Sequence, residues 1–318
     1  MVAPAPRACS LVGGAAQLDA AARGLAPLGA PVIVYCASHS GSRLLADLLG
    51  RLGLFMGARL NDSGDALDVL DLVRYLIERH APDFSPLFAR ADPQLAALVQ
   101  RAFRAHLAGR APGQPWGWKL PETSHVLPVV SRLFPAARCI HLVRDGRDVA
   151  LSPFLAPKHP FWRRVYFNTD SIRRWRGLGL TQRAYRRHGP LFNAQRWVNS
   201  VTLGRAHGLM LGERYMEVRY EALVADPVTE LARIALFIGV QPRGGLIEPG
   251  EIGAARVGKW RARPAREIRV LKGVLEPTLS AFGYGLSPRA VASEEGVSAG
   301  SGAAPGGLGG LFRVRARR

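Results

Sequence analysis

Short apolar runs rich in β-branched residues alternate along the chain with longer segments whose apolar residues recur every three or four positions. The short runs predict buried strands, and the longer segments predict amphipathic helices. The predicted strands are 31–37, 117–120, 138–143 and 215–218. The predicted helices are 44–52, 68–80, 94–107, 123–134, 145–151, 193–211, 226–238 and 265–282. We expect Pro277 to kink or break the last helix.

This alternation indicates an α/β fold, with a mostly parallel sheet covered by helices on both faces. We predict a single domain over residues 30–286 and find no internal repeat. Residues 1–29 are rich in Ala and Gly but interrupted by charges, so we expect a loose N-terminal extension and no secretory signal. Residues 287–318 turn to Ala, Gly and Ser with a basic end, which predicts a disordered tail.

The composition is typical of a globular protein, with 48% hydrophobic and 21% charged residues. No apolar stretch approaches the roughly 20 residues that a membrane helix needs. The three cysteines are far apart, and Cys36 and Cys139 lie inside apolar runs. This placement favours small buried core residues over a disulfide framework. A reducing, cytoplasmic location fits these features.

The chain is strongly basic: 43 Lys and Arg against 24 Asp and Glu give a formal charge of +19. Such an excess indicates an anionic partner or a solvated basic surface. The segment 153–212 holds ten arginines, one acid and several interleaved aromatics, and we interpret it as an Arg-rich helical insertion. It could hold an acidic sugar, an aromatic ring or a lipid headgroup, or it could be a basic helix hairpin that covers the site.

A polar loop, SHSGSR at 38–43, lies between the first predicted strand and its helix. Backbone amides at such a position, together with the positive end of the helix dipole, form an anion site. A plain strand–helix turn is the alternative interpretation. The nucleotide-binding pattern G-x-x-x-x-G-K-[ST] is absent, because the nearest match, at 253–260, has Trp260 in place of the Ser or Thr.

A second polar cluster, RDGRDVALS at 144–152, directly follows the strand predicted at 138–143. Two Arg and two Asp at the end of a buried strand are typical of a site that grips a phosphate and orients its own cations. A salt-bridged surface turn accounts for the charges but not for the position behind an apolar strand.

Four segments in order resemble the motifs of the PAPS-dependent sulfotransferases. HSGSRLL at 39–45 resembles the 5′-phosphosulfate loop of that family, and RDGRDVALS resembles its 3′-phosphate motif. VRYEAL at 218–223 resembles the family's Y-E-D-L segment, and RVGKWR at 256–261 resembles its late basic loop. The resemblance spans residues 31–284 and implies the P-loop-like sulfotransferase fold.

The resemblance implies that 3′-phosphoadenosine 5′-phosphosulfate (PAPS) is the cosubstrate and that no metal is required. The implied ligands of the 5′-phosphosulfate are His39, Ser40, Gly41, Ser42 and Arg43. The implied ligands of the 3′-phosphate are Arg144, Ser152, Arg256, Gly258 and Lys259, with Tyr220 beside the adenine. His39 stands where the family usually has Lys or Arg, so it can neutralise leaving-group charge only when protonated or by donating a neutral hydrogen bond.

In-line sulfuryl transfer needs cations and amides at the leaving oxygen and a base for the acceptor's proton. Lys119, in WGWKLPE, resembles the lysine that the family places beside the transferring group. The candidate bases are Asp65 and Glu122, then Asp62, with His125 nearby. Helix capping is the competing interpretation of Asp65 and Glu122.

The implied acceptor is a hydroxyl or amine on a small molecule, glycan or lipid, and the basic charge is compatible with an anionic acceptor or with peripheral membrane contact. No nucleic-acid partner is expected. A nucleotide-dependent, kinase-like enzyme and a non-catalytic nucleic-acid-binding protein remain as alternatives, as does a relative that binds the cosubstrate but no longer transfers sulfate. Oligomeric state and acceptor identity stay open.

Overall fold

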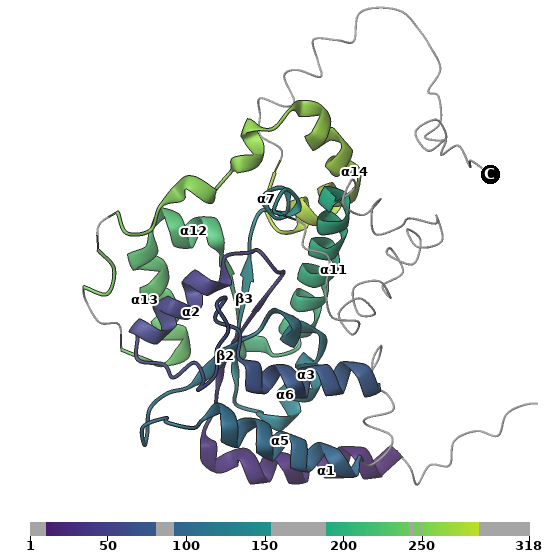
Figure 1. The fold of residues 1–318 in the computed structure, drawn as a ribbon, viewed down its shortest axis with the longest axis vertical. Helices are drawn as coiled ribbons and strands as arrows, with labels where there is room; N and C mark the ends of the chain where they lie inside the picture. Colours follow the sequence, from purple (N-terminus) through teal and green to yellow (C-terminus); the bar gives the residue numbers. More distant parts are fainter. Residues whose placement is uncertain (1–10, 81–91, 154–188, 242–244, 249, 286–318) are drawn as a thin grey trace, which may run out of the picture.

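A four-stranded parallel sheet forms the centre of the protein (Figure 1). The computed structural model describes residues 11–80, 92–153, 189–241, 245–248 and 250–285. The strands are β1 (Val32–Cys36), β2 (Gly117–Lys119), β3 (Arg138–Val143) and β4 (Tyr215–Arg219), in the order β2-β1-β3-β4. Each neighbouring pair is parallel, which confirms the predicted α/β fold with a parallel sheet.

The central strand β1 is buried on both of its faces. Ile33 and Tyr35 belong to the core cluster on one face, whereas Val34 and Cys36 belong to the cluster on the other. Because successive side chains of a strand point to opposite faces, a strand covered on both sides must be apolar at every position. This is why β1 appears in the sequence as an uninterrupted apolar run.

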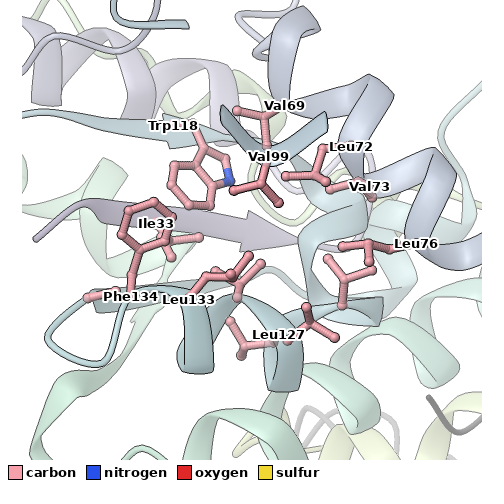
Figure 2. Close-up of a cluster of buried hydrophobic side chains, with 14 of the residues drawn as sticks. Ile33, Val69, Leu72, Val73, Leu76, Val99, Trp118, Leu127, Leu133 and Phe134 are labelled. Carbon is pink, nitrogen blue, oxygen red and sulfur yellow. The ribbon is translucent and has the colours of Figure 1, made fainter. Parts of the chain in front are cut away.

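Four helices line the core on one face of the sheet: α1 (Leu11–Leu25), α3 (Leu67–His80), α5 (Pro93–His106) and α6 (Leu127–Leu133). Figure 2 shows part of this core, in which Trp118 of β2 and Ile33 of β1 lie among aliphatic side chains such as Leu72 of α3 and Leu127 of α6. Trp118 is completely buried, and such large apolar side chains supply much of the stability of a core.

The opposite face carries α2 (Ser42–Arg51), α12 (Tyr220–Ala225) and α13 (Pro227–Ile238), on the left of Figure 1. The start of α13 agrees with the sequence signal, since the Asp226 side chain accepts the Thr229 amide at 3.1 Å and Pro227 occupies the first turn. A third core cluster joins α7 (Gly146–Ala150), α11 (Gly189–Leu209) and α14 (Ala265–Ala281) beyond the end of β3.

Short 3-10 turns connect several of these elements. They are η2 (Ala26–Leu28), η3 (Pro121–His125), η4 (Gly212–Arg214), η5 (Ala254–Arg256) and η6 (Lys259–Ala262). Together with α7, η6 brings the late basic segment of the chain to the carboxyl end of β3.

The N-terminal segment is not a loose extension over residues 11–25, and that prediction was wrong. These residues form α1, in which Leu18 is fully buried and Leu25 is 3% exposed, and the helix packs on α5 and α6. The high Ala and Gly content concealed an apolar stripe with helical spacing. The Arg-rich insertion lies largely outside the described residues, and the predicted tail at 287–318 lies wholly outside them.

Two helices differ from the prediction at a proline. The helix expected over 123–134 is divided into η3 and α6, because Pro128 has no amide hydrogen and its ring excludes the carbonyl four residues earlier from a continuous helix. Pro277, by contrast, lies inside an unbroken α14. It lies on the exposed side of the helix, where the Gly273 carbonyl left without its donor can face water.

Cys36 and Cys139 are buried free thiols, as predicted. Burial raises the pKa of each thiol to about 12, so both are protonated at neutral pH. In the part of the chain that the structure describes, no helix combines the length and the apolar character needed to cross a bilayer.

We expect Leu18→Ala to lower the free energy of unfolding by about 2–5 kcal/mol, because it leaves a cavity in a closed core. Leu209→Ala is the control, since Leu209 is 66% exposed and its truncation should change the same quantity by less than about 0.5 kcal/mol. Urea denaturation followed by circular dichroism measures both. Equal effects of the two substitutions would contradict the place of α1 in the core.

Candidate functional site

The loop between β1 and α2 carries hydrogen-bond donors without acceptors. Ser40 is 1% exposed, and its Oγ has no hydrogen-bond partner among the described residues. The amides of Gly41, Ser42 and Arg43 lie at the start of α2, where the first helical turn leaves its N–H groups unpaired. Because buried polar groups without partners are destabilising, this loop favours an anion at its centre.

Two backbone positions in the left-handed region shape this loop. The φ angle is 71° at His39 and 87° at Gly41, and His39 is the one described residue other than glycine with a positive φ. A Cβ atom at Gly41 would lie 2.2 Å from Cε2 of Tyr220. Gly41 therefore both turns the chain and leaves room for the Tyr220 ring at the start of α12.

Arg144, at the end of β3, joins this loop to the late basic segment. Its Nη1 donates to the His39 carbonyl at 3.2 Å, and its Nη2 donates to the Arg256 carbonyl. The guanidinium carbon lies 4.6 Å from the centre of the Tyr220 ring. The buried Nε has no partner among the described residues, so at least this donor is directed at no protein acceptor.

Asp148, in α7, anchors the segment that contains Gly258. Its Oδ2 accepts the Gly258 amide at 2.7 Å, and its Oδ1 accepts the Trp260 amide at 3.0 Å. Asp148 also lies 3.5 Å from Nη2 of Arg144. The amide of Gly258, expected to help with a phosphate, is thus directed at this carboxylate.

Three further groups predicted for the 3′-phosphate gather at the same place. Nζ of Lys259 donates to Oγ of Ser152 at 3.2 Å, and the Ser152 hydroxyl donates to the Asp148 carbonyl at 3.0 Å. The pKa of Lys259 is lowered, first by burial and then by the nearby Arg144, with Arg256 adding to the repulsion. Such a concentration of cations favours a polyanionic ligand.

The other Arg–Asp pair of the 144–152 segment has a structural role. The Arg147 side chain binds Asp145 with three hydrogen bonds, from Nε to Oδ1 at 2.9 Å and to Oδ2 at 3.1 Å and from Nη2 to Oδ2 at 2.7 Å. Its guanidinium lies 3.9 Å from the Trp260 ring centre. Glu221 accepts the Asp145 amide at 2.9 Å and the Tyr284 hydroxyl at 2.8 Å. These contacts fix the end of β3.

Lys119, at the end of β2, is buried and makes a short ion pair. Its Nζ lies 2.6 Å from Oδ1 of Asp65 and 2.6 Å from the Ser63 carbonyl. Asn61 holds the other oxygen of Asp65 with a hydrogen bond of 3.0 Å. The sequence placed Asp65 and Lys119 in one candidate site, and the structure brings their side chains into direct contact.

The remaining candidates are positioned less directly. Lys119, Asp65 and Glu122 all influence the pKa of Cys36 at the end of β1, so Glu122 shares the neighbourhood of the ion pair. Asp62 is exposed at the surface of its loop, and Arg43 is exposed on α2. His125 has its pKa lowered to about 4 by burial and by the neighbouring His207, which makes it neutral at physiological pH.

The His39 side chain is uncharged at neutral pH. Although part of the residue faces solvent, the protein atoms around the ring lower its pKa to about 4, and Arg196, Lys259 and Arg144 repel the charged form. His39 therefore supplies no positive charge to the loop while no anion is bound, in contrast to the Lys or Arg that is usual in the resembled family.

Asp148 and Trp197 were not among the predicted site residues. Trp197, on α11, donates from Nε1 to the Arg144 carbonyl at 2.9 Å and fills the space beside Gly146. The spacing of Asp148, four residues after Arg144 at a strand–helix junction, is a signal that could have singled it out. Nothing in the sequence near Trp197 identifies its partner.

The sheet and its site define a class of protein: an α/β protein with cations and hydrogen-bond donors, some of them unpaired in the described part of the chain, at the carboxyl ends of adjacent parallel strands. A family model described as the sulfotransferase family matches residues 31–243, which is more than half of the chain. The chain therefore belongs to the sulfotransferase family, whose members are enzymes, and the resemblance found in the motifs is confirmed.

Three of the solved structures that the chain matches are sulfotransferases or sulfotransferase domains. A sulfotransferase domain from the curacin biosynthetic pathway aligns with a TM-score of 0.51 and 19% identity, over 81% of this chain and 99% of that domain. The sulfotransferase domain of the Synechococcus PCC 7002 olefin synthase aligns with a TM-score of 0.46 and 20% identity, over 81% and 96%. A mouse sulfotransferase in complex with PAP aligns with a TM-score of 0.39 and 13% identity, over 84% and 88%. A search of the curated proteins found no match.

We expect Gly41→Ala to lower the free energy of unfolding by about 1–3 kcal/mol, since the new methyl group would meet the Tyr220 ring at a left-handed φ. Gly50→Ala, in the same helix and with nothing within 4 Å, is the matched control and should stabilise by about 0.5–1 kcal/mol. Thermal and urea unfolding of both variants measure the difference. A Gly41 variant as stable as the Gly50 variant would refute this packing.

Proposed function

We propose that this sulfotransferase transfers a sulfuryl group from PAPS to a hydroxyl or amine of an acceptor. The observation that carries the proposal is the pairing of an anion-binding loop after β1 with a cation cluster after β3, connected by Arg144. The bond between sulfur and the bridging oxygen of the phosphosulfate breaks, and a bond from sulfur to the acceptor oxygen or nitrogen forms. The acceptor's proton passes to a protein base, and adenosine 3′,5′-bisphosphate (PAP) leaves.

The loop of residues 39–43 would bind the 5′-phosphosulfate through its amides and through the Ser40 hydroxyl, whose Oγ has no other partner among the described residues. Arg144, through Nε, and Lys259 would contact the 3′-phosphate, with Arg256 adding positive charge nearby. Ser152 lies within 3.2 Å of Lys259 and supports the same end. Preorganised donors and cations of this kind stabilise charge without reorganisation during the reaction.

Tyr220 would lie beside the adenine, as the resemblance implies. Its ring packs against Gly41 of the loop after β1 and lies 4.6 Å from the guanidinium carbon of Arg144. These two contacts support a position for Tyr220 between the groups proposed to bind the 5′-phosphosulfate and the 3′-phosphate.

Lys119 would face the leaving oxygen, and Asp65 would take the acceptor's proton. Their 2.6 Å contact supports a shared role, because it keeps a carboxylate and an ammonium together at the end of β2. Glu122, in the same neighbourhood, is the second choice for the base, and the exposed Asp62 is the third. His39 would contribute a neutral hydrogen bond.

The acceptor is a small molecule, with anionic sugars and lipids as the classes that best fit a charge of +19. A cytoplasmic site of action and peripheral contact with an anionic membrane remain predictions from the sequence. The residues of the Arg-rich insertion that would bear on this question lie mostly outside the described part of the chain.

We expect PAP, at about 100 times its Kd, to raise the free energy of unfolding by roughly 2.7 kcal/mol in a thermal-shift assay. ATP with Mg²⁺ at the same concentration should stabilise much less, since it lacks the 3′-phosphate. Stronger stabilisation by ATP would indicate a kinase-like enzyme. Stabilisation by oligonucleotides alone would indicate a nucleic-acid-binding protein.

We expect Asp65→Asn to lower kcat by about 10²–10⁴-fold while the affinity for PAP stays near that of the wild type. The rate is that of labelled sulfate transfer from PAPS to the best acceptor in a panel of phenols, alcohols and amines. Asp62→Asn changes the third candidate, an exposed acid in the same loop, and should leave kcat near that of the wild type if Asp65 is the base. Loss of transfer in Glu122→Gln, with normal transfer in Asp65→Asn, would move the base to Glu122.

A further inference from the structure

Asp148 is a buried carboxylate at the centre of the groups assigned to the 3′-phosphate. It is 0% exposed, and each of its oxygens accepts a backbone amide, from Gly258 at 2.7 Å and from Trp260 at 3.0 Å. A carboxylate that is closed off in this way cannot reach a nucleotide, and its negative charge would repel a phosphate. Asp148 is therefore not a ligand itself.

The same residue is linked to each of the cationic and hydroxyl groups around it. Its carboxylate lies 3.5 Å from Nη2 of Arg144, and its carbonyl accepts the Ser152 hydroxyl at 3.0 Å. Lys259 lies in the chain between the two residues whose amides Asp148 binds, and its Nζ reaches Ser152 at 3.2 Å. Arg144 and Lys259 are therefore one hydrogen bond and one residue away from this carboxylate, and Ser152 is linked to the backbone carbonyl of the same residue.

These cations would otherwise separate. Arg144, Arg256 and Lys259 repel one another, and Asp148 is the group that opposes this repulsion at Lys259. The amides of Gly258 and Trp260 bind an anion already supplied by the protein, so the turn that carries Lys259 has a fixed position before any nucleotide arrives.

We propose that Asp148 is a positioning residue that holds the segment 256–260 against Arg144, and that selectivity for a nucleotide with a 3′-phosphate depends on it. The identity of that nucleotide rests on the proposed function. The alternative is that Asp148 only stabilises the fold, which would weaken every ligand of the protein to the same extent.

Asp145 provides the matched control. It belongs to the same segment and is 5% exposed, but its carboxylate binds Arg147 and accepts no amide from 256–260. Replacing either acid with Asn keeps its size and removes a buried charge. The two variants differ in whether the lost charge bound the backbone amides of the late basic segment, since in the described part of the chain Asp145 reaches that segment only through the contact of Arg147 with the Trp260 ring.

The test compares PAP with adenosine 5′-phosphate (AMP), which lacks the 3′-phosphate, by calorimetric titration of the full chain. Asp148→Asn should raise the Kd for PAP by about 10–100-fold, as expected for losing hydrogen bonds to a charged group, and change the Kd for AMP much less. Asp145→Asn should leave the ratio of the two Kd values unchanged. Hydrogen exchange should be faster at the amides of Gly258 and Trp260 in the first variant only.

Equal losses of PAP and AMP affinity in Asp148→Asn, or an unchanged PAP affinity, would overturn the proposal. If the Asn variant does not fold, Asp148→Glu keeps the charge, displaces the segment and should show the same loss of selectivity. If the wild-type chain binds neither PAP nor AMP, the proposed function fails. The exchange rates at Gly258 and Trp260 would then still decide whether Asp148 holds the segment.

Discussion

A buried guanidinium connects the parts of this site. Arg144 is 4% exposed, and it hydrogen-bonds the carbonyls of His39 and Arg256, which lie 105 and 112 residues away in the sequence. A buried cation is tolerated only with an anion and acceptors around it, and Asp148 supplies the anion. These contacts are possible because β1 and β3 are neighbouring parallel strands, so that their carboxyl ends lie next to each other. The loops after β1 and β3 are thus positioned by two conditions: the buried guanidinium of Arg144 needs partners, and the strand order places these two strands side by side.

The same requirement explains why the site favours a multiply charged ligand. Burial and neighbouring cations lower the pKa of His39 to about 4 and also lower the pKa of Lys259. In both residues burial is the largest cause, and repulsion from the neighbouring cations lowers the pKa further. An anion between these groups would relieve the repulsion between the cations. It would also accept hydrogen bonds from the Ser40 hydroxyl and from Nε of Arg144, which have no other partners among the described residues. A nucleotide with anionic groups at two positions satisfies both ends together.

Local patterns predicted much of the fold. Strand β3 was predicted with its observed bounds. An apolar, β-branched run of this length, between Pro135 and a charged turn, is typical of a buried strand. Helix α1 was missed, because its high Ala and Gly content conceals the apolar stripe that packs on α5 and α6. Pro277 was expected to break α14, but the effect of a proline depends on whether the freed carbonyl meets water.

The motifs identified the groups around the site, and the contacts between them needed the structure. Arg144 and Lys259 were predicted from their motifs. The role of Asp148 depends on the Gly258 amide, 110 residues later in the chain, which no periodicity or spacing can reveal. The contact between Asp65 and Lys119 spans 54 residues in the same way. Such pairings are decided by tertiary structure, and a single sequence carries little direct signal of them.

Because His39 is neutral, the proposed reaction needs another cation to stabilise the charge on the leaving oxygen, and Lys119 at the end of β2 is the candidate. Nζ of Lys119 has three donors, and two of them already bind Asp65 and the Ser63 carbonyl at 2.6 Å. If Asp65 takes the acceptor's proton, as proposed, its carboxylate would lose the charge that holds the ammonium. Lys119 would then be attracted to the bridging oxygen, where negative charge would develop as the bond to sulfur breaks. Removal of the proton and stabilisation of the leaving group would be coupled through one ion pair, which would offset the absence of a cation at His39.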